Sequence, residues 1–174
     1  MTRPILHTDR LVLEPASAAH LDAYLAFYAI PNDQKGGYRA PQDREAVIAI
    51  LDRAILDWQR LGHGMFVIKR KDDGSYVGGT GIVQPAKWPR HELTWWLMPQ
   101  AQGTGFATEA SRAVLNWAYD VLGWSLVETH MRDENMPARR LVERLGAKKL
   151  TRETFPDGVT RDVFALPKPE ASAA

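Results

Sequence analysis

The sequence feature that most narrows the possible folds of this chain is a glycine-rich turn between a predicted strand and a predicted helix. The turn runs from Gln102 to Thr108 with Gly103 and Gly105 inside it, after an apolar strand pattern and before a helical one. Glycines let the backbone approach a ligand closely, and the first amides of a helix have no acceptor within the helix. These amides and the positive end of the helix dipole favour a phosphate or pyrophosphate. The turn therefore predicts an anion site in an α/β fold.

Three other interpretations of this glycine turn must be weighed against an anion site. A plain tight turn with a glycine N-cap stays open on these residues alone. A Walker loop is excluded because no Gly-Lys-Ser/Thr follows at the required spacing. Gly103, Gly105 and Thr108 nearly spell a dinucleotide fingerprint, and Glu128 follows about 20 residues on. That interpretation fails because the turn follows an antiparallel meander, and the 66 residues after Thr108 are too few for a doubly wound sheet.

Hydrophobic periodicity and chain breakers place the turn in a βααβββαβαββ order. Strands are predicted at 11–13, 65–68, 76–83, 92–98, 124–131 and 160–166, and helices at 17–28, 47–61, 107–122 and 135–145. The 45% hydrophobic and 25% charged fractions are those of a globular protein, so disorder is excluded. With no repeat or linker, we expect one domain at 1–166 and a flexible tail at 167–174.

Charge and cysteine content narrow the function further. The 22 basic and 21 acidic residues give a net charge of +1, so we expect no nucleic-acid partner. No window approaches the ~20 apolar residues of a membrane span and no signal-like apolar region opens the chain. We therefore expect a cytoplasmic protein with no membrane partner. The absence of cysteine excludes disulfides, thiolate zinc sites and an acyl-cysteine intermediate, and no metal is expected.

The chain resembles the GCN5-related N-acetyltransferases (GNAT), whose pyrophosphate motif is Q/R-x-x-G-x-G/A. Gln102, Gly105 and Ala107 fill that motif. Residues 92–99 followed by 103–110 look like the RimJ/RimL branch, which acetylates protein N-termini and, in other members, small amines. Similar stretches at 8–15, 133–135 and 145–147 extend the resemblance over roughly residues 8–166.

The resemblance implies a single-domain GNAT-like α/β sandwich with a mixed, mostly antiparallel, V-shaped central sheet of about six or seven strands. It also implies acetyl-CoA as cosubstrate, an amine acceptor (a protein or peptide N-terminus or a small-molecule amine) and direct attack in a ternary complex; a homodimer is compatible with it. A bulge would splay the strand at 95–97 so that its amides bind the pantetheine arm. The implied cofactor-binding residues are Trp96, Leu97, Gln102, Gly103, Thr104, Gly105, Phe106, Ala107, Thr108 and Asn135.

Two residues are candidates for the catalytic base. His130 occupies the strand position that some family members use for a carboxylate base, and histidine has an unperturbed pKa of ~6.5. Glu92 competes with it because it begins the neighbouring strand and could reach the cleft. A hydrogen-bonded structural histidine and a solvated strand-end carboxylate are the non-catalytic interpretations, and both stay open.

The chain departs from the family pattern at two positions. Val142 stands where many members have a tyrosine that protonates the leaving sulfur, and Ala138 where the RimJ/RimL branch often has serine. These departures keep a second hypothesis open, a non-catalytic acyl-CoA-binding or regulatory module. For the acceptor, Trp58, Tyr38, Trp88 and the loop at 36–41 are candidates to flank the cleft, and packing of the same aromatic side chains in the core stays open as the alternative.

Overall fold

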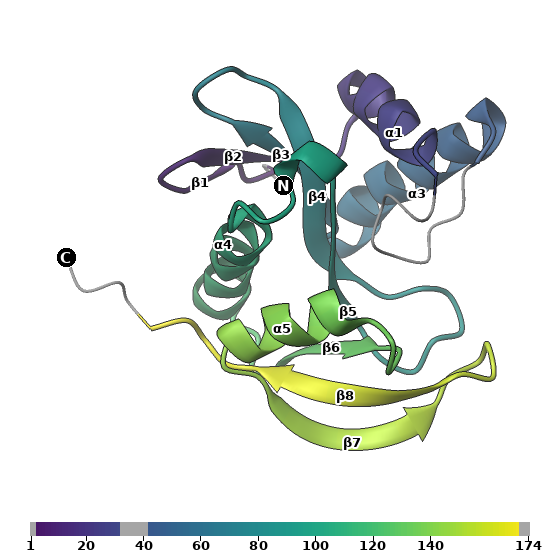
Figure 1. The fold of residues 1–174 in the computed structure, drawn as a ribbon, viewed down its shortest axis with the longest axis vertical. Helices are drawn as coiled ribbons and strands as arrows, with labels where there is room; N and C mark the ends of the chain where they lie inside the picture. The colour runs from purple at the N-terminus through teal and green to yellow at the C-terminus, as the bar shows by residue number, and fades with distance from the viewer. Residues whose placement is uncertain (1–2, 32–41, 171–174) are drawn as a thin grey trace.

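The computed structural model of the protein describes residues 3–31 and 42–170. Its described strands form two antiparallel sheets, one of five strands in the order β1-β2-β3-β4-β5 and one of three in the order β6-β8-β7 (Figure 1). The first sheet contains β1 (Leu6–His7), β2 (Leu11–Pro15), β3 (Met65–Arg70), β4 (Tyr76–Val83) and β5 (Glu92–Leu97). The second contains β6 (Val127–Met131), β7 (Lys148–Thr154) and β8 (Thr160–Leu166).

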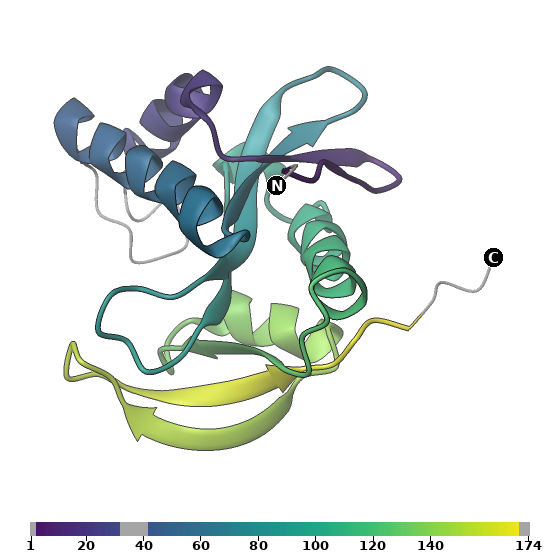
Figure 2. The same ribbon diagram turned by 180° about the vertical axis from the view of Figure 1, so that it is seen from behind.

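The helices cover both faces of the five-stranded sheet. They are α1 (Leu21–Tyr28), α3 (Arg44–Leu61), α4 (Phe106–Asp120) and α5 (Met136–Arg144), with short 3-10 turns at Ala18–His20 and Pro99–Ala101. Seen from behind, α1 and α3 lie on one face of that sheet and α4 on the other (Figure 2). Because both faces are covered, β3 buries four consecutive residues, Met65 to Ile68, whereas the buried residues of β2 alternate.

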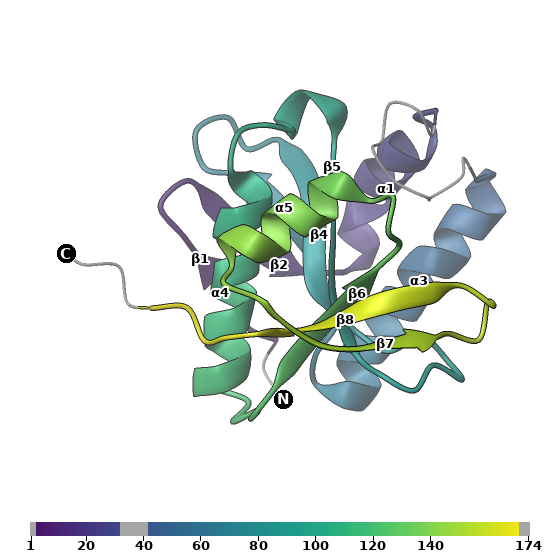
Figure 3. The same cartoon turned by 60° about the horizontal axis from the view of Figure 1, so that its bottom comes forward.

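The feature that positions the site is the divergence of β5 from β6. The strands are in contact where the second residue of β5 meets the middle of β6, and there Thr129 Oγ1 donates to the carbonyl of Leu93 at 2.9 Å. They belong to different sheets, and α5 lies across the region where they separate (Figure 3). The predicted α/β sandwich is confirmed, with two differences. The described strands form two sheets instead of one mixed central sheet, and every hydrogen-bonded strand pair among them is antiparallel, since β5 and β6 separate instead of forming a ladder.

One predicted cleft residue lies in the core instead. The Trp58 side chain is 4% exposed, donates through Nε1 to the carbonyl of Met65 at 2.7 Å, and packs edge-on against Phe66. Its position on the apolar stripe of α3 carries it against the sheet and away from any cleft. Of the two alternatives for Trp58, the structure therefore shows core packing, while Tyr38 and the loop at 36–41 lie outside the described residues.

Two elements have boundaries that differ from the prediction. The strand predicted at 124–131 begins only at Val127, because Gly123 adopts a left-handed conformation (φ 69°) and residues 124–126 still belong to the connection. Strand β7, for which no range was predicted, is mostly exposed and carries no apolar alternation. Of the described helices, none combines the length and apolar character that crossing a membrane requires.

Candidate active site

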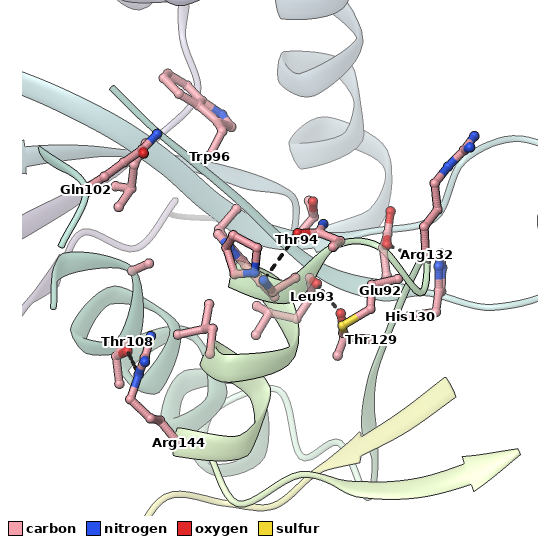
Figure 4. A pocket seen from close by; sticks show the side chains of 18 of the residues that line it. Glu92, Leu93, Thr94, Trp96, Gln102, Thr108, Thr129, His130, Arg132 and Arg144 are labelled. Atoms are coloured by element: carbon pink, nitrogen blue, oxygen red, sulfur yellow. Dashed lines mark hydrogen bonds and ion pairs between the residues drawn. The ribbon is translucent and has the colours of Figure 1, made fainter. Parts of the chain in front are cut away.

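A cavity of about 440 Å³ lies where β5 and β6 diverge. Figure 4 shows its two ends, with Gln102 and Thr108 near α4 on one side and Glu92, His130 and Arg132 on the other. The residues that line it include both candidate bases and every predicted cofactor-binding residue except two: Glu92, His130, Trp96, Leu97, Gln102, Gly103, Gly105, Ala107, Thr108 and Asn135. Thr104 and Phe106 are not among the lining residues. The fold thus brings the two predicted sets into one space.

The turn before α4 presents helix amides to this cavity. Gly105 is the N-cap in the left-handed region (φ 81°), and Gly103 is also left-handed (φ 73°). The helical ladder starts with the Glu109 amide, which donates to the Gly105 carbonyl at 3.0 Å, so the amides of 106–108 precede it. Left-handed backbone is strained for any residue with a Cβ, so the two glycines make this turn possible.

An arginine outside the turn holds it in place. Arg10 follows β1 and its guanidinium binds the Glu109 carboxylate (2.7 Å) and the Thr104 carbonyl (3.0 Å), and lies over the Phe106 ring. Burial would raise the pKa of Glu109, but hydrogen bonds from Thr8 and Arg10 outweigh it and keep the pKa below its usual value. Thr104 and Phe106 therefore serve the turn as parts of this support, rather than as walls of the cavity.

Strand β5 supplies the wall between the two ends. Its register with β4 runs without a shift from Glu92↔Val83 to Leu97↔Gly78, so the bulge expected at 95–97 is absent from this pairing. The opening comes from the other edge of β5, where alternate backbone groups have no strand ladder. The Trp96 indole packs on Phe27 and on Gly79, where a Cβ would collide with the ring. Trp96 is therefore a core residue as well as part of the wall.

Helix α5 lies across β5 and β6 and forms another wall of the cavity. Asn135 caps this helix, its Oδ1 accepting from the Ala138 amide at 3.3 Å, and both residues line the cavity. Val142, 1% exposed, packs in the core and does not line it. At the helix end, Arg144 Nε lies 3.4 Å from Thr108 Oγ1, beside the glycine turn. Sequence reasoning missed Arg144, because nothing in the chain order places it near residue 108.

Glu92 and His130 meet at the opposite end. His130 Nε2 lies 3.3 Å from Glu92 Oε2 without a hydrogen-bonding geometry, and the imidazole is stacked on Trp88 with ring centroids 5.4 Å apart. Phe155 packs on it at 4.2 Å. Burial, assisted by the charge of Arg161, lowers the pKa of His130 to about 4. The expectation of an unperturbed histidine was wrong, because the aromatic walls remove the water that would solvate an imidazolium.

Two arginines complete this end of the cavity. The Arg161 side chain is only 8% exposed and forms a bidentate salt bridge with the Asp157 carboxylate (2.6 and 2.8 Å). Its guanidinium lies over the Trp88 and Phe155 rings. Arg132 follows β6, lines the cavity and lies 3.7 Å from the same carboxylate. Trp88, expected to flank the cleft, does line it. Neither arginine could be found from sequence, since they lie on separate segments that only the fold brings together.

Comparisons with known proteins agree with this arrangement. The family model described as "Acetyltransferase (GNAT) domain" matches residues 10–148. The uncharacterized N-acetyltransferase YoaA of Bacillus subtilis (strain 168) is 26% identical over 175 residues, covering 95% of this chain and 98% of YoaA. The crystal structure of an acetyltransferase from Agrobacterium tumefaciens str. C58 superposes with a TM-score of 0.82 at 27% identity, with 96% of each chain covered.

A more distant structure shares the fold. RimL, the ribosomal L7/L12 alpha-N-protein acetyltransferase, in complex with coenzyme A, has a TM-score of 0.77 at 16% identity, over 95% of this chain and 99% of that one. Together the matches define the protein as an acetyltransferase. More narrowly, the chain belongs to the GNAT family, and it is an acetyl-CoA-dependent N-acetyltransferase. Within residues 3–31 and 42–170, no group of three or more His, Asp or Glu side chains could hold a metal ion.

Proposed function

We propose that the protein transfers the acetyl group of acetyl-CoA directly to a primary amine while both substrates occupy the cavity. The observation that carries this proposal is the continuity of the cavity, which runs from the helix amides at Gly105 to the Glu92–His130 pair. A cavity with an anion site at one end and a carboxylate at the other suits a phosphorylated acyl donor and an amine. Holding both reactants in one space removes the entropic cost of their encounter.

The cofactor would occupy the end formed by α4, β5 and α5. Its pyrophosphate would bind the amides of Ala107 and Thr108 at the Gly103 and Gly105 turn, with Gln102 beside it, since the Phe106 amide donates to Thr104 Oγ1 at 3.4 Å. The pantetheine arm would follow the open edge of β5 at Trp96 and Leu97, across from Asn135. Backbone amides on that edge would polarise the thioester carbonyl where negative charge develops during attack. Thr104 and Phe106 would contribute through the shape of the turn.

Glu92 is the better proton acceptor of the two candidates. Its carboxylate lines the cavity at the first residue of β5, where it would attract an ammonium group and take its proton directly or through water. The neutral amine then attacks the acetyl carbon, the C–N bond forms, and the C–S bond breaks to release the CoA thiolate. The nitrogen loses its second proton to water, and this proton balances the one that the thiolate takes up. His130 stays neutral at pH 7 with a pKa of about 4, so it is a weak base. We assign it a positioning role beside Glu92.

The leaving thiolate needs little assistance in this scheme. No tyrosine or serine occurs among the described residues that line the cavity, and Val142 lies in the core. A thiol has a pKa near ~8.5, so its anion leaves readily and takes a proton from water at neutral pH. The departures at Ala138 and Val142 are therefore compatible with turnover.

Release of free CoA tests the proposal. The protein is incubated with acetyl-CoA and, separately, with amino acids, short peptides and aminoglycosides, and free thiol is followed over time. We expect release that depends on the amine and yields the N-acetylated product by mass spectrometry. Tight CoA binding with no release on any amine would instead favour a non-catalytic acyl-CoA-binding module.

A further inference from the structure

The acceptor end of the cavity carries charges of both signs. Glu92 is the one carboxylate among the described lining residues, while Arg132 and Arg161 line the same end. Glu92 and Arg161 interact electrostatically, which places their charged groups near each other. Asp157, which pairs with both arginines, is not a lining residue. The wall that an acceptor meets is therefore negative at Glu92 and positive at the two arginines.

Arg161 retains donors for a second anion, and Arg132 adds a positive charge beside it. A guanidinium has five N–H donors, and Arg161 uses three hydrogen bonds on Asp157 and the Val159 carbonyl. Its side chain is more than nine-tenths buried, so a carboxylate bound there would be shielded from water and held strongly. Arg132 lines the same end of the cavity with about a third of its side chain exposed, so its positive charge faces the space that an acceptor would occupy.

We propose that the natural acceptor carries a carboxylate close to its primary amine, with the ammonium at Glu92 and the carboxylate at Arg132 and Arg161. This inference rests on the proposed function, because it names the class of amine that the same site acetylates. Two sources share this chemistry, a free amino acid and a peptide N-terminus with an acidic residue next to it. A polyamine or an aminoglycoside is disfavoured, since its further ammonium groups would meet the two arginines.

Matched acceptors separate recognition from intrinsic reactivity. The free amino acid arm compares L-phenylalanine with L-phenylalaninamide and 2-phenylethylamine, whose apolar ring suits the Trp88 side of the cavity. The peptide arm compares Ala-Glu-amide with Ala-Gln-amide. Loss of the carboxylate makes the amine of the amide lose its proton more easily, so intrinsic reactivity favours phenylalaninamide over phenylalanine. A preference for the acid must therefore come from the protein.

The arginine most suitable for substitution is Arg132, because Arg161 is buried on Asp157. We expect at least one arm to favour the carboxylate acceptor in kcat/KM by about 10- to 100-fold, the range of a charged hydrogen bond. Arg132→Gln should remove most of that preference and leave the KM for acetyl-CoA unchanged, whereas Arg132→Lys should keep part of it. The control is Arg140→Gln on α5, which is exposed and does not line the cavity.

The outcomes distinguish this inference from the function on which it rests. If carboxylate-free amines are acetylated as well as their partners in both arms, or the preference survives Arg132→Gln, the inference is overturned while the acetyltransferase function stands. If no amine of any kind releases CoA, the proposed function fails and the inference fails with it. A preference in the peptide arm alone would identify the acidic N-terminus as the source of the carboxylate.

Discussion

The two ends of the cavity are built by different means. The end near α4 is made largely of backbone, from a turn at 102–108 that is continuous in sequence and depends on left-handed glycines. The end near Glu92 is made of side chains from four separate segments, the β4–β5 loop, β5, β6 with the residue after it, and β8. A backbone site is therefore sensitive to main-chain conformation, whereas a side-chain site is sensitive to charge. The predictions below test that contrast.

The largest effect is expected at the backbone end. Gly105→Val should remove measurable CoA binding, because a β-branched residue opposes the left-handed conformation on which the turn depends, and its Cβ would lie against the Arg10 guanidinium that supports the turn. Left-handed backbone costs a residue with a Cβ about 1–2 kcal/mol, so Tm should also fall. Isothermal titration calorimetry with CoA and thermal melts measure the two effects.

Gly123→Val provides the matched control for this variant. Gly123 follows the other end of α4, is also left-handed (φ 69°) and has open space around its Cβ position. It should lower Tm by a similar amount and leave CoA affinity unchanged. Equal losses of affinity in both variants would show that Gly105 acts only through stability, and would remove the argument for a pyrophosphate site at this turn.

The next effect belongs to the side-chain end. Glu92→Gln should lower kcat/KM by roughly 10²–10⁴-fold, the usual contribution of a general base, with little change in CoA affinity. The amide keeps the shape of the side chain but cannot accept the ammonium proton as an anion. Steady-state kinetics with a saturating amine, together with CoA calorimetry, make the measurement. A loss of only a few-fold would indicate that bulk water takes the proton and that proximity carries the reaction.

The same contrast explains what the sequence could predict. The glycine turn is a local pattern, so Gln102, Gly105 and Thr108 could be predicted as cofactor-binding residues, and all three line the cavity. Arg132 and Arg161 come from different strand ends, and a single sequence contains no signal that pairs them. The pKa of His130 could not be predicted either, because it depends on Trp88 and Phe155, which lie 42 and 25 residues away in the chain.

Some elements of the fold could not be predicted from the sequence for a related reason. Strand β1 has only two residues, and its pairing with β2 depends on register rather than composition. Strand β7 is recognised only by its ladder with β8, since its exposed side chains show no apolar alternation. The sequence left both a cleft and a core position open for Trp58, because an aromatic side chain alone does not distinguish the two, and the structure places it in the core.

A smaller effect concerns the stability of the side-chain end. Because burial lowers the pKa of His130 to about 4, the unfolded chain binds a proton between pH ~6.5 and 4 that the folded chain does not. This group should therefore stabilise the fold fully above pH ~6.5, and up to about 3 kcal/mol should be lost as the pH falls toward 4. His130→Phe keeps an aromatic ring between Trp88 and Phe155 and should flatten that part of the curve. The measurement is the free energy of unfolding by urea for both proteins from pH 7 to 4. The same dependence on pH in both proteins would contradict the lowered pKa.

The smallest effect is expected at the end of the cavity near α4, where Arg144 is the positively charged side chain among the described lining residues. Arg144 lies beside Thr108 at the start of α4 and lines both the cavity and the groove between α4 and the β1–β2 hairpin. If the amides carry most of the anion binding, Arg144→Gln should raise the KM for acetyl-CoA only about tenfold, as expected for one charged contact that is partly exposed to solvent. The loss should shrink at high salt, because screening already weakens the wild-type contact. Arg140→Gln, exposed on the same helix and away from both sites, should change neither value. A loss with Arg144→Gln as large as that with Gly105→Val would mean that a side chain, and not the backbone, dominates binding at this end.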